Sequence, residues 1–294
     1  MMKKYDVVSL GEVLIDELRL GDRSVANVGG APANFARGAS RMGLRCAFIG
    51  AVGDDERGRE CLRALKDDGV EPLCAVKRAG TTLALVTLDE EGDRSFKFIR
   101  GADALLAEAD VDAGAIASSR VLHVGTLSLS AEPARSATLA ALAAAKKSGT
   151  AVSCDVNYRE ALWPSAEAAR EAALSVMPDV TLLKVSGEEA ELLAGPAKPE
   201  EAAAHLASLG PATVAVTLGA DGAVVFSQGK TVRVSAKPAD AVDTTGAGDA
   251  FWAAFLARLL RSGAAGEASP ELAKACAEAG AEAAAECVSR PGAL

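Results

Sequence analysis

The most informative stretch of this 294-residue sequence is Val242-Asp243-Thr244-Thr245-Gly246-Ala247-Gly248-Asp249-Ala250-Phe251. Two glycines flank a small residue at the point where an apolar helix, about 248–261, is predicted to begin. The first turn of a helix offers unpaired N–H groups and a positive dipole end. Gly246 and Gly248 let an anion approach these amides closely. The pattern therefore predicts a phosphate site with a carboxylate, Asp249, beside it. A simple helix start with a capping aspartate is the alternative.

A carboxylate next to an anion site is suited to take a proton from a hydroxyl that attacks phosphorus. Phosphoryl transfer depends mainly on positioning and charge stabilisation, so an ordinary aspartate can serve as the base. The sequence contains no G-x-x-x-x-G-K-[ST] motif, and no G-x-G-x-x-G follows the first expected strand. These absences weigh against a P-loop enzyme and against a nicotinamide-dependent oxidoreductase.

A second motif, Gly29-Gly30-Ala31-Pro32-Ala33-Asn34, lies near the start of the chain. Paired glycines followed by proline at a helix start let the backbone press against a ligand. Asn34 offers both a donor and an acceptor, which suits a sugar hydroxyl. Asp16 could accept two hydroxyl protons. By itself the Gly-Gly pair also fits an ordinary turn.

Short β-branched segments alternate with Ala- and Leu-rich helical segments along most of the chain. This rhythm predicts an α/β fold, a three-layer α/β/α sandwich with a mostly parallel central sheet. The expected strands of this sheet are 6–10, 45–49, 121–124, 151–154, 181–185, 213–217, 224–226 and 231–234. The expected helices are 31–42, 56–66, 131–147, 188–193, 200–209, 248–261 and 270–285.

Four further strands have no crossover helix after them. They are expected at 13–20, 25–28, 83–88 and 95–100, with turns at Gly21-Asp22 and at 89–94. We expect them to pair antiparallel as a small β-sheet, with the inserted segments at about 13–28 and 72–100. Such a flap over the carboxyl ends of the main sheet would form a lid.

The bulk composition excludes several functional classes. The formal net charge is −9, which argues against nucleic acid and acidic membranes as partners. No apolar segment approaches the roughly 20 residues that span a bilayer, and no signal peptide is evident, so a cytoplasmic location is expected. The six cysteines form no C-x-x-C pair, which predicts reduced and mostly buried thiols.

On its two motifs the chain resembles the pfkB carbohydrate kinase family, which has the ribokinase-like fold. The resemblance covers the whole chain, 1–294, as a single kinase domain with the lid inserted. It implies that Asp249 is the catalytic base and that the amides of Gly246, Ala247 and Gly248 form an anion hole. It also implies sugar-binding roles for the residues of the N-terminal motifs: Asp16, Gly29, Gly30 and Asn34.

The resemblance further implies ATP and Mg²⁺ as partners of the reaction. It places Lys184, Thr217, Gly219 and Gly222 at the nucleotide. Glu189 matches the acid that organises magnesium through water, with Ser186 in place of the usual asparagine. Members of this family often bind K⁺ beside the anion hole, and Asp243 and Thr245 would lie on that loop.

Three stretches bear on the sugar. Gly11-Glu12-Val13-Leu14-Ile15-Asp16 and the Gly-Gly motif look more like fructokinases than ribokinases. Asp155-Val156-Asn157-Tyr158-Arg159-Glu160-Ala161-Leu162-Trp163 is similar to a stretch of fructokinases and of 2-keto-3-deoxygluconate kinases, with Val156 replacing the usual proline. Arg159 would point at the substrate or the phosphate. Its alternative is an ion pair on a loop.

The lid strand places Phe98 and Arg100 on one face by its period of two, where they would cover the sugar. Simple packing of the flap is the alternative. Lid tyrosines are common in relatives that use keto-acid sugars, so their absence favours a neutral ketose such as fructose. Rival substrates are 2-keto-3-deoxygluconate and a riboside, and a non-catalytic sugar-binding relative is the remote alternative. The resemblance also implies a homodimer formed through the lid, whose exposed edges are available for pairing.

Overall fold

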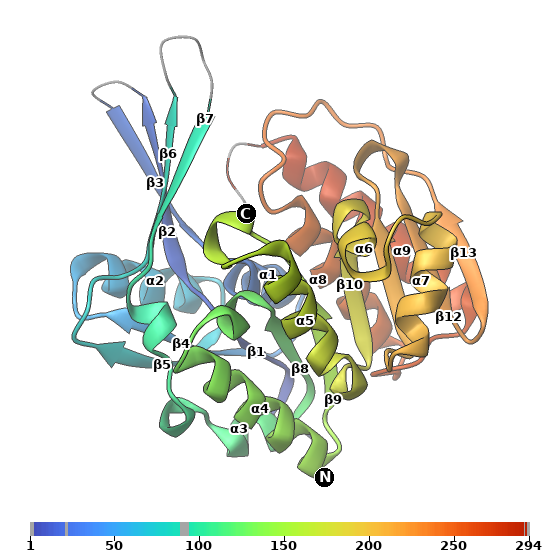
Figure 1. The fold of residues 1–294 in the computed structure, drawn as a ribbon, viewed down its shortest axis with the longest axis horizontal. Helices are drawn as coiled ribbons and strands as arrows, with labels where there is room; N and C mark the ends of the chain where they lie inside the picture. Colours follow the sequence, from blue (N-terminus) through green and yellow to red (C-terminus); the bar gives the residue numbers. More distant parts are fainter. Residues whose placement is uncertain (1–2, 21–22, 89–93, 291, 293–294) are drawn as a thin grey trace.

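Nine strands form the central sheet of the computed structural model, which describes residues 3–20, 23–88, 94–290 and 292 (Figure 1). Their order across the sheet is β13-β12-β11-β10-β9-β8-β1-β4-β5. The strands from β11 to β5 in this order are parallel, while β12 and β13 add an antiparallel meander at one edge. The bounds are β1 Tyr5–Leu10, β4 Cys46–Gly53, β5 Glu71–Lys77, β8 Ser119–Gly125, β9 Ala151–Asp155, β10 Leu182–Ser186, β11 Thr213–Thr217, β12 Ala223–Ser227 and β13 Lys230–Val234.

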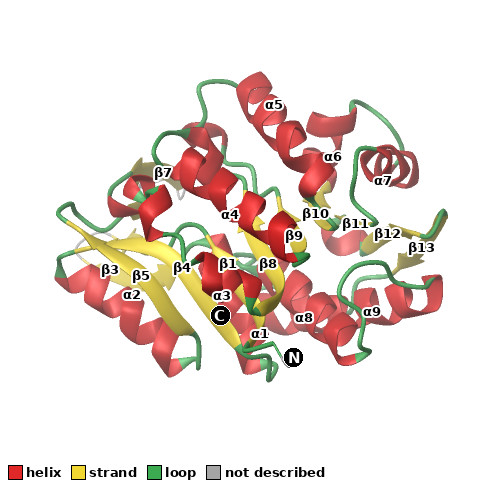
Figure 2. Ribbon diagram, turned by 90° about the horizontal axis from the view of Figure 1, so that it is seen from below, coloured by secondary structure: helices red, strands yellow, loops and turns green. Residues whose placement is uncertain are grey.

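Helices cover both faces of this sheet, so the predicted three-layer sandwich is confirmed (Figure 2). One layer contains α1 (Ala31–Arg41), α2 (Glu56–Asp67), α8 (Ala247–Arg261) and α9 (Pro270–Val288). The other contains α3 (Ala113–Ala117), α4 (Ala134–Ser148), α5 (Ala166–Val176), α6 (Gly187–Ala194) and α7 (Pro199–Ser208). Within the described residues, none of these helices combines the length and the apolar character needed to cross a bilayer.

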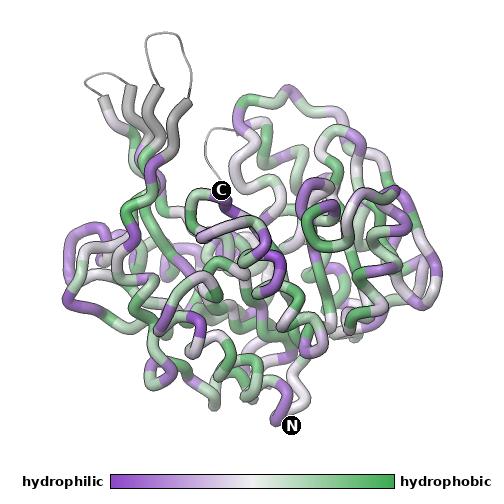
Figure 3. The backbone as a smooth tube through the Cα atoms, viewed as in Figure 1, coloured by the Kyte–Doolittle hydropathy of each residue, from purple (hydrophilic) through white to green (hydrophobic). Residues whose placement is uncertain are grey.

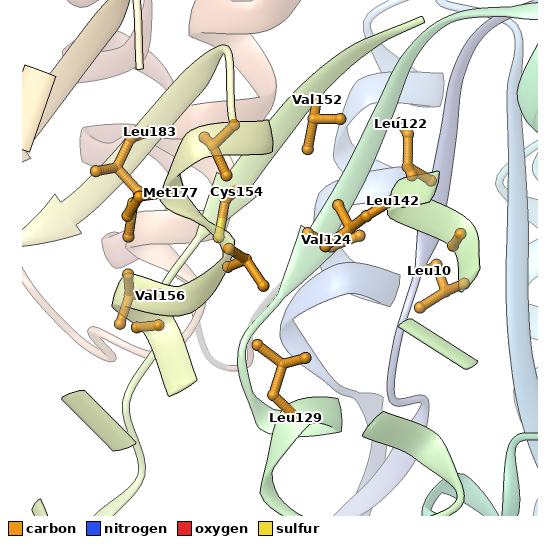
Figure 4. Packing of buried hydrophobic residues seen from close by; sticks show 14 of the residues in the cluster. Leu10, Leu122, Val124, Leu129, Leu142, Val152, Cys154, Val156, Met177 and Leu183 are labelled. Carbon is orange, nitrogen blue, oxygen red and sulfur yellow. The ribbon is translucent and has the colours of Figure 1, made fainter. Parts of the chain in front are cut away.

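The sheet is buried on both faces because successive side chains of each strand enter different hydrophobic layers. Val7 packs in the layer under α1 and α8, while its neighbour Val8 packs in the layer under α4 to α7. Figure 4 shows part of the second layer around Leu122, Val124 and Leu142, and Figure 3 shows hydrophobic residues concentrated along these central strands.

A buried polar contact ties α1 and α8 to the sheet. Trp252 of α8 donates its indole N–H to Ser153 Oγ at 2.8 Å, and His123 Nδ1 lies 3.0 Å from the same oxygen. The His123 ring stacks on Phe35 of α1, with ring centroids 3.7 Å apart. Burial lowers the pKa of His123 to about 3, so the ring is neutral. This contact fixes both helices over the strands whose ends form the site.

The small sheet projects from the body, as predicted for a lid (Figure 1). Its order is β3-β2-β6-β7, with bounds β2 Leu14–Leu20, β3 Arg23–Gly29, β6 Leu83–Leu88 and β7 Arg94–Ile99. The two hairpins are antiparallel, but β2 and β6 in the middle pair in parallel, which corrects the expectation of an all-antiparallel sheet. The reason is that β2 and β6 both run outward from the body. The expected turns at 21–22 and 89–93 lie outside the described residues.

The boundary predicted for the second lid segment, residue 72, also needs correction. Glu71–Lys77 is β5, which pairs in parallel with β4 at the edge of the main sheet. It follows α2, and a strand–helix–strand crossover of this kind returns the chain to the same sheet beside the first strand. The lid segment therefore begins at β6.

The strand order reverses between β1 and β8: the chain runs outward to β4 and β5 on one side and to β9, β10 and β11 on the other. In open α/β sheets, ligands bind outside the carboxyl ends of the strands at this reversal. The segment after β1 leads directly into the lid. The fold therefore places a site between the lid and the carboxyl edge of β8 to β11.

Candidate active site

The first turns of two helices meet at this edge. Asn34 in α1 donates its side-chain N–H to Asp249 Oδ2 in α8 at 3.0 Å, although the two residues are 215 positions apart in the sequence. Both side chains are buried, with 8% of Asp249 exposed. The side-chain oxygen of Asn34 is buried without a hydrogen-bond partner among the described residues, which leaves one acceptor for a ligand. The two predicted motifs thus form one site.

The predicted anion hole is the N-terminus of α8. Gly246 precedes the helix with φ of +77°, a left-handed conformation that favours glycine. A Cβ atom added at Gly248 would lie 2.7 Å from Lys184 Nζ. The ammonium group of Lys184 therefore touches the backbone that would cradle an anion. Lys184 thus lies beside the N-terminus of α8, and its role at ATP stays a prediction.

Lys184 is held by Asp155, at the end of the neighbouring strand β9. Its Nζ lies 3.0 Å from both carboxylate oxygens, and the Lys184 side chain is only 8% exposed. Burial alone would lower the pKa of Lys184, but Asp155, Glu189 and Asp249 outweigh burial and raise it, so the lysine stays charged. Three carboxyl groups thus act on one buried cation, although the described residues contain no group of three or more His, Cys, Asp or Glu side chains arranged to hold a metal ion.

Glu189 stabilises the backbone around this cluster. Its Oε1 accepts the N–H of Tyr158, and its Oε2 accepts the N–H of Ser186, both at 2.7 Å. Ser186 Oγ accepts the Glu189 N–H in return, which completes a capping box at the start of α6. The buried carboxylate therefore joins the stretch after β9 to the start of α6, at the place predicted for an acid that holds magnesium through water.

Burial raises the pKa of Asp249 above its usual range, and Asp16 adds to this effect. Lys184, the hydrogen bond from Asn34 and Arg159 lower the pKa in opposition. A carboxylate with a raised pKa that still faces cations is a stronger proton acceptor than an exposed one. These charges support its predicted role as a base.

The lid contributes Asp16, on β2. A Cβ atom at Gly29 would lie 1.9 Å from Asp16 Oδ2, so only glycine leaves room for this carboxylate. Gly30 has φ of +101°, and a Cβ atom there would lie 2.5 Å from the carbonyl oxygen of Glu12. Burial raises the pKa of Asp16 to about 6; Arg159 opposes this rise and Asp243 adds to it. The Gly-Gly pair thus shapes the backbone around an acid.

Phe98 lies on the same face of the lid as Asp16. Directly paired residues form a row across the four strands, and paired residues point to the same face of a sheet. The row consists of Asn27, Asp16, Ala84 and Phe98. Phe98 is partly buried, and the small Ala84 side chain separates it from Asp16. This arrangement agrees with the predicted aromatic cover.

Arg159 is exposed, and its guanidinium donates to the carbonyl oxygen of Tyr158 at 3.0 Å. It lowers the pKa of both Asp16 and Asp249, so its charge acts on the lid carboxylate and on the body carboxylate. The other predicted arginine, Arg100, lies elsewhere. Its guanidinium pairs with Asp103 at 2.9 Å and donates to Ser130 Oγ at 3.3 Å, at the base of the lid.

The predicted nucleotide loop follows β11. Thr217 is the last residue of this strand, and its hydroxyl donates to the carbonyl oxygen of Val185 at 3.3 Å. Gly222 has φ of +88°, and a Cβ atom there would lie 2.0 Å from the carbonyl oxygen of Val234. Gly219 has φ of +59° and no heavy atom within 4 Å of its added Cβ. One glycine is therefore required by packing, whereas the other faces open space.

Asp243 shapes the loop before the anion hole. Its Oδ1 accepts the N–H of Thr245 at 2.9 Å, and its Oδ2 accepts the N–H of Gly292 at 3.0 Å. The sulfhydryl of Cys287 donates to the Thr245 carbonyl at 3.5 Å. This loop therefore gathers backbone and carboxylate oxygens beside α8, the donor type that hard cations prefer.

A sequence profile described as "pfkB family carbohydrate kinase" matches residues 3–294. Fructokinase-2 of Zea mays is 41% identical over 268 residues, which cover 87% of this chain and 80% of that protein. Fructokinase-1 of Oryza sativa subsp. japonica is 41% identical over the same length, with 87% and 83% covered. The chain belongs to the pfkB family of carbohydrate kinases.

Solved structures of carbohydrate kinases and their relatives share the fold. A fructokinase from Vibrio cholerae O395 with fructose, ADP and calcium bound has a TM-score of 0.88 at 32% identity, covering 99% of this chain and 95% of that one. An aminoimidazole riboside kinase from Salmonella enterica has a TM-score of 0.84 at 27% identity, covering 98% and 95%.

Sequence reasoning missed two buried acids of this pfkB chain. Asp155 opens a stretch that was singled out for Arg159, and Glu12 lies in the Gly-Glu-Val-Leu-Ile-Asp motif that was singled out for Asp16. Each acid directly follows, or lies at the end of, an apolar strand, where an ionised group is costly to bury without a partner. That position was the available signal.

We predict that the Asp155–Lys184 pair couples strongly in stability. Lys184→Met alone leaves a carboxyl group buried without its cation and should destabilise the fold by about 3–5 kcal/mol. The double variant Lys184→Met/Asp155→Leu removes both charges and should recover most of that loss. Urea unfolding of the wild type, Lys184→Met, Asp155→Leu and the double variant measures the coupling. Additive losses in the double variant would contradict it.

Proposed function

We propose that this protein is an ATP-dependent sugar kinase that transfers the γ-phosphate to fructose, giving fructose 6-phosphate. The observation that carries the proposal is the buried Asp249, fixed by Asn34 beside the N-terminus of α8 and facing Lys184. A base, an anion cradle and a cation at one point are what phosphoryl transfer to a hydroxyl requires. The fructokinase relatives support fructose as the acceptor.

In this mechanism Asp16 and Asn34 hold the sugar hydroxyls, and Asp249 accepts the proton of the attacking hydroxyl. The hydroxyl oxygen forms a bond to the γ-phosphorus as the bond to the bridging oxygen breaks, and ADP leaves with that electron pair. The amides of Gly246, Ala247 and Gly248, together with Lys184, stabilise the charge on the transferred group. The contact between Asn34 and Asp249 and the position of Lys184 beside Gly248 support these proposed roles.

Two cations complete the proposal. Mg²⁺ would offset the charge of the nucleotide phosphates, and Glu189 would hold it through water. K⁺ would be held on the loop of Asp243 and Thr245. At the nucleotide itself, Thr217 and the open backbone at Gly219 would contact ATP, while Gly222 keeps the turn in shape.

Arg159 favours one alternative, a 2-keto-3-deoxygluconate kinase, because a guanidinium near Asp16 and Asp249 could bind a sugar carboxylate in a two-pronged contact. A riboside kinase is the second alternative, since such an enzyme shares the fold. Phe98, which lies on the row of Asp16 and carries no polar group, fits a neutral ketose better than a keto acid. All three readings keep the same mechanism.

We predict that turnover depends on Asp249. ATP consumption is measured with Mg²⁺ and K⁺ against fructose, ribose, 2-keto-3-deoxygluconate, tagatose and adenosine. Fructose should be preferred, and Asp249→Asn, which keeps the shape and the contact with Asn34, should reduce kcat by about 100-fold or more. Preference for another sugar would correct the substrate alone. Full activity of the variant would rule out the proposed mechanism, and inactivity with every substrate would favour a non-catalytic relative.

Gly29→Ala should impair sugar binding selectively. The added methyl group must displace the Asp16 carboxylate, so we expect KM for fructose to rise about 10-fold or more, while the Kd for ATP changes little. Gly80→Ala is the matched control, because the nearest atom to its added Cβ, Asp55 Oδ2, is 3.9 Å away. Equal effects of the two substitutions on KM would contradict the role of Asp16.

The lid also supports a homodimer. Its edge strands β3 and β7 expose Val25 and Ile99, at 50% and 47% of their surface. Exposed apolar edges favour pairing with another strand. We expect a dimer by light scattering at micromolar concentration, and Val25→Lys/Ile99→Lys should shift it toward monomer. A monomeric wild type would refute this part of the proposal.

A further inference from the structure

Polar side chains gather at the base of the lid. The chain crosses between body and lid four times: before β2, after β3, before β6 and after β7 (Figure 1). We call the group the hinge cluster. It consists of Glu12, Thr82, Arg100 and Asp103.

Three members of the hinge cluster are tightly connected. The Thr82 hydroxyl donates to Asp103 Oδ1 and also accepts the N–H of Gly101, the latter at 2.7 Å. Arg100 Nη2 pairs with Asp103 Oδ2 at 2.9 Å. These contacts join the start of β6 to the end of β7. These contacts therefore lie at the junction of lid and body.

Glu12 connects this hinge to the sugar side of the site. Its Oε1 accepts the N–H of Ala31, the first residue of α1, at 3.2 Å. Its carbonyl oxygen lies against Gly30. Glu12 therefore contacts the helix that carries Asn34. Glu12 is buried, with 6% of the residue exposed, and the charges of Arg100 and Asp103 act on its carboxyl group.

One atom of an acidic side chain and one atom of a basic side chain in this cluster lack a hydrogen bond. Glu12 Oε2 and Arg100 Nε are both buried and without a hydrogen bond among the described residues. A buried unpaired donor or acceptor costs free energy until it is satisfied. A short movement of the lid that brings these two atoms together would satisfy both at once. The sequence predicted that Arg100 contacts the sugar. We assign Arg100 instead to a contact within the protein.

We propose that Glu12 is a positioning residue whose carboxylate pairs with Arg100 when the lid closes over the sugar, so that α1 and the lid hinge are locked together by substrate. This inference rests on the proposed sugar kinase function. It assigns Arg100 to lid closure and leaves recognition of the sugar to Asp16, Asn34 and Phe98.

Closure should then be linked to a proton. Burial raises the pKa of Glu12 to about 7; Asp103 adds to this rise, while Arg100 and the Ala31 N–H oppose it. Near pH 7 the carboxyl group is therefore about half protonated before sugar binds. Pairing with Arg100 favours the ionised form and expels the proton. By linkage, sugar binding should tighten as pH rises through 7.

Calorimetric titration of fructose in two buffers of different ionisation enthalpy counts this proton. At pH 7 the wild type should release about half a proton more per bound sugar than Glu12→Gln, in which the amide still accepts from Ala31. Release that remains in the variant comes from the other carboxyl groups with a raised pKa, Asp16, Asp155 and Asp249. Arg100→Gln should also reduce the proton release, because Glu12 then keeps its proton when sugar binds. This variant tests the proposed pairing even if Glu12→Gln does not fold.

Glu17→Gln is the matched control, a buried carboxyl group on β2 that pairs with Arg57 at 2.8 Å, away from the hinge cluster. It should release protons as the wild type does. Glu12→Gln should raise KM for fructose severalfold above pH 7 and leave it unchanged below pH 6, with kcat affected less than KM. Equal proton release in the wild type, Glu12→Gln and Arg100→Gln would overturn the proposal. Failure of the wild type to bind any sugar would instead refute the proposed function.

Discussion

The hydrogen bond from Asn34 to Asp249 is the contact on which the site depends. It joins the first turns of α1 and α8, the two helices that begin at glycines where the strand order reverses. Both helices are also fixed to the sheet beneath, through Phe35, Trp252 and the neutral His123. Because the base is held from both sides, its distance to the anion cradle is set by the packing of the core and needs no ligand to establish it.

The charges around this contact explain why cations belong to the proposed reaction. Asp16, Asp155, Glu189 and Asp249 converge on one edge of the sheet, and the described cations that affect them are Lys184 and Arg159. Phosphates brought to this edge would face carboxylates as well as the N-terminus of α8. Metal ions are often the largest local charges in such sites and reverse this repulsion. Lys184 alone cannot offset this repulsion, because its charge is already balanced by the paired Asp155.

The sequence predicted the parts of the fold that local patterns encode. Alternating apolar strands and helices gave the three layers, and the glycines before α8 and α1 indicated both halves of the site. The pattern could not show that β5 joins the main sheet or that β2 and β6 pair in parallel, since these are contacts between distant segments. Nor could it show which arginine lies near Asp16 and Asp249. Arg100 and Arg159 look alike in sequence, and only their neighbours, Asp103 for one and Asp16 for the other, separate them.

The division of the site between two sheets has a chemical consequence. The body supplies the base and the anion cradle, whereas the lid supplies Asp16 and Phe98 on one row. Asp16 is only partly buried. In the proposed reaction, water that reached this side of the site could compete with the sugar hydroxyl for the γ-phosphate. A lid that closes only on sugar excludes this competitor and brings Asp16 towards Asp249 together with the substrate. In the proposed mechanism, the partly buried lid side of the site would thus select the hydroxyl that the buried Asp249 deprotonates.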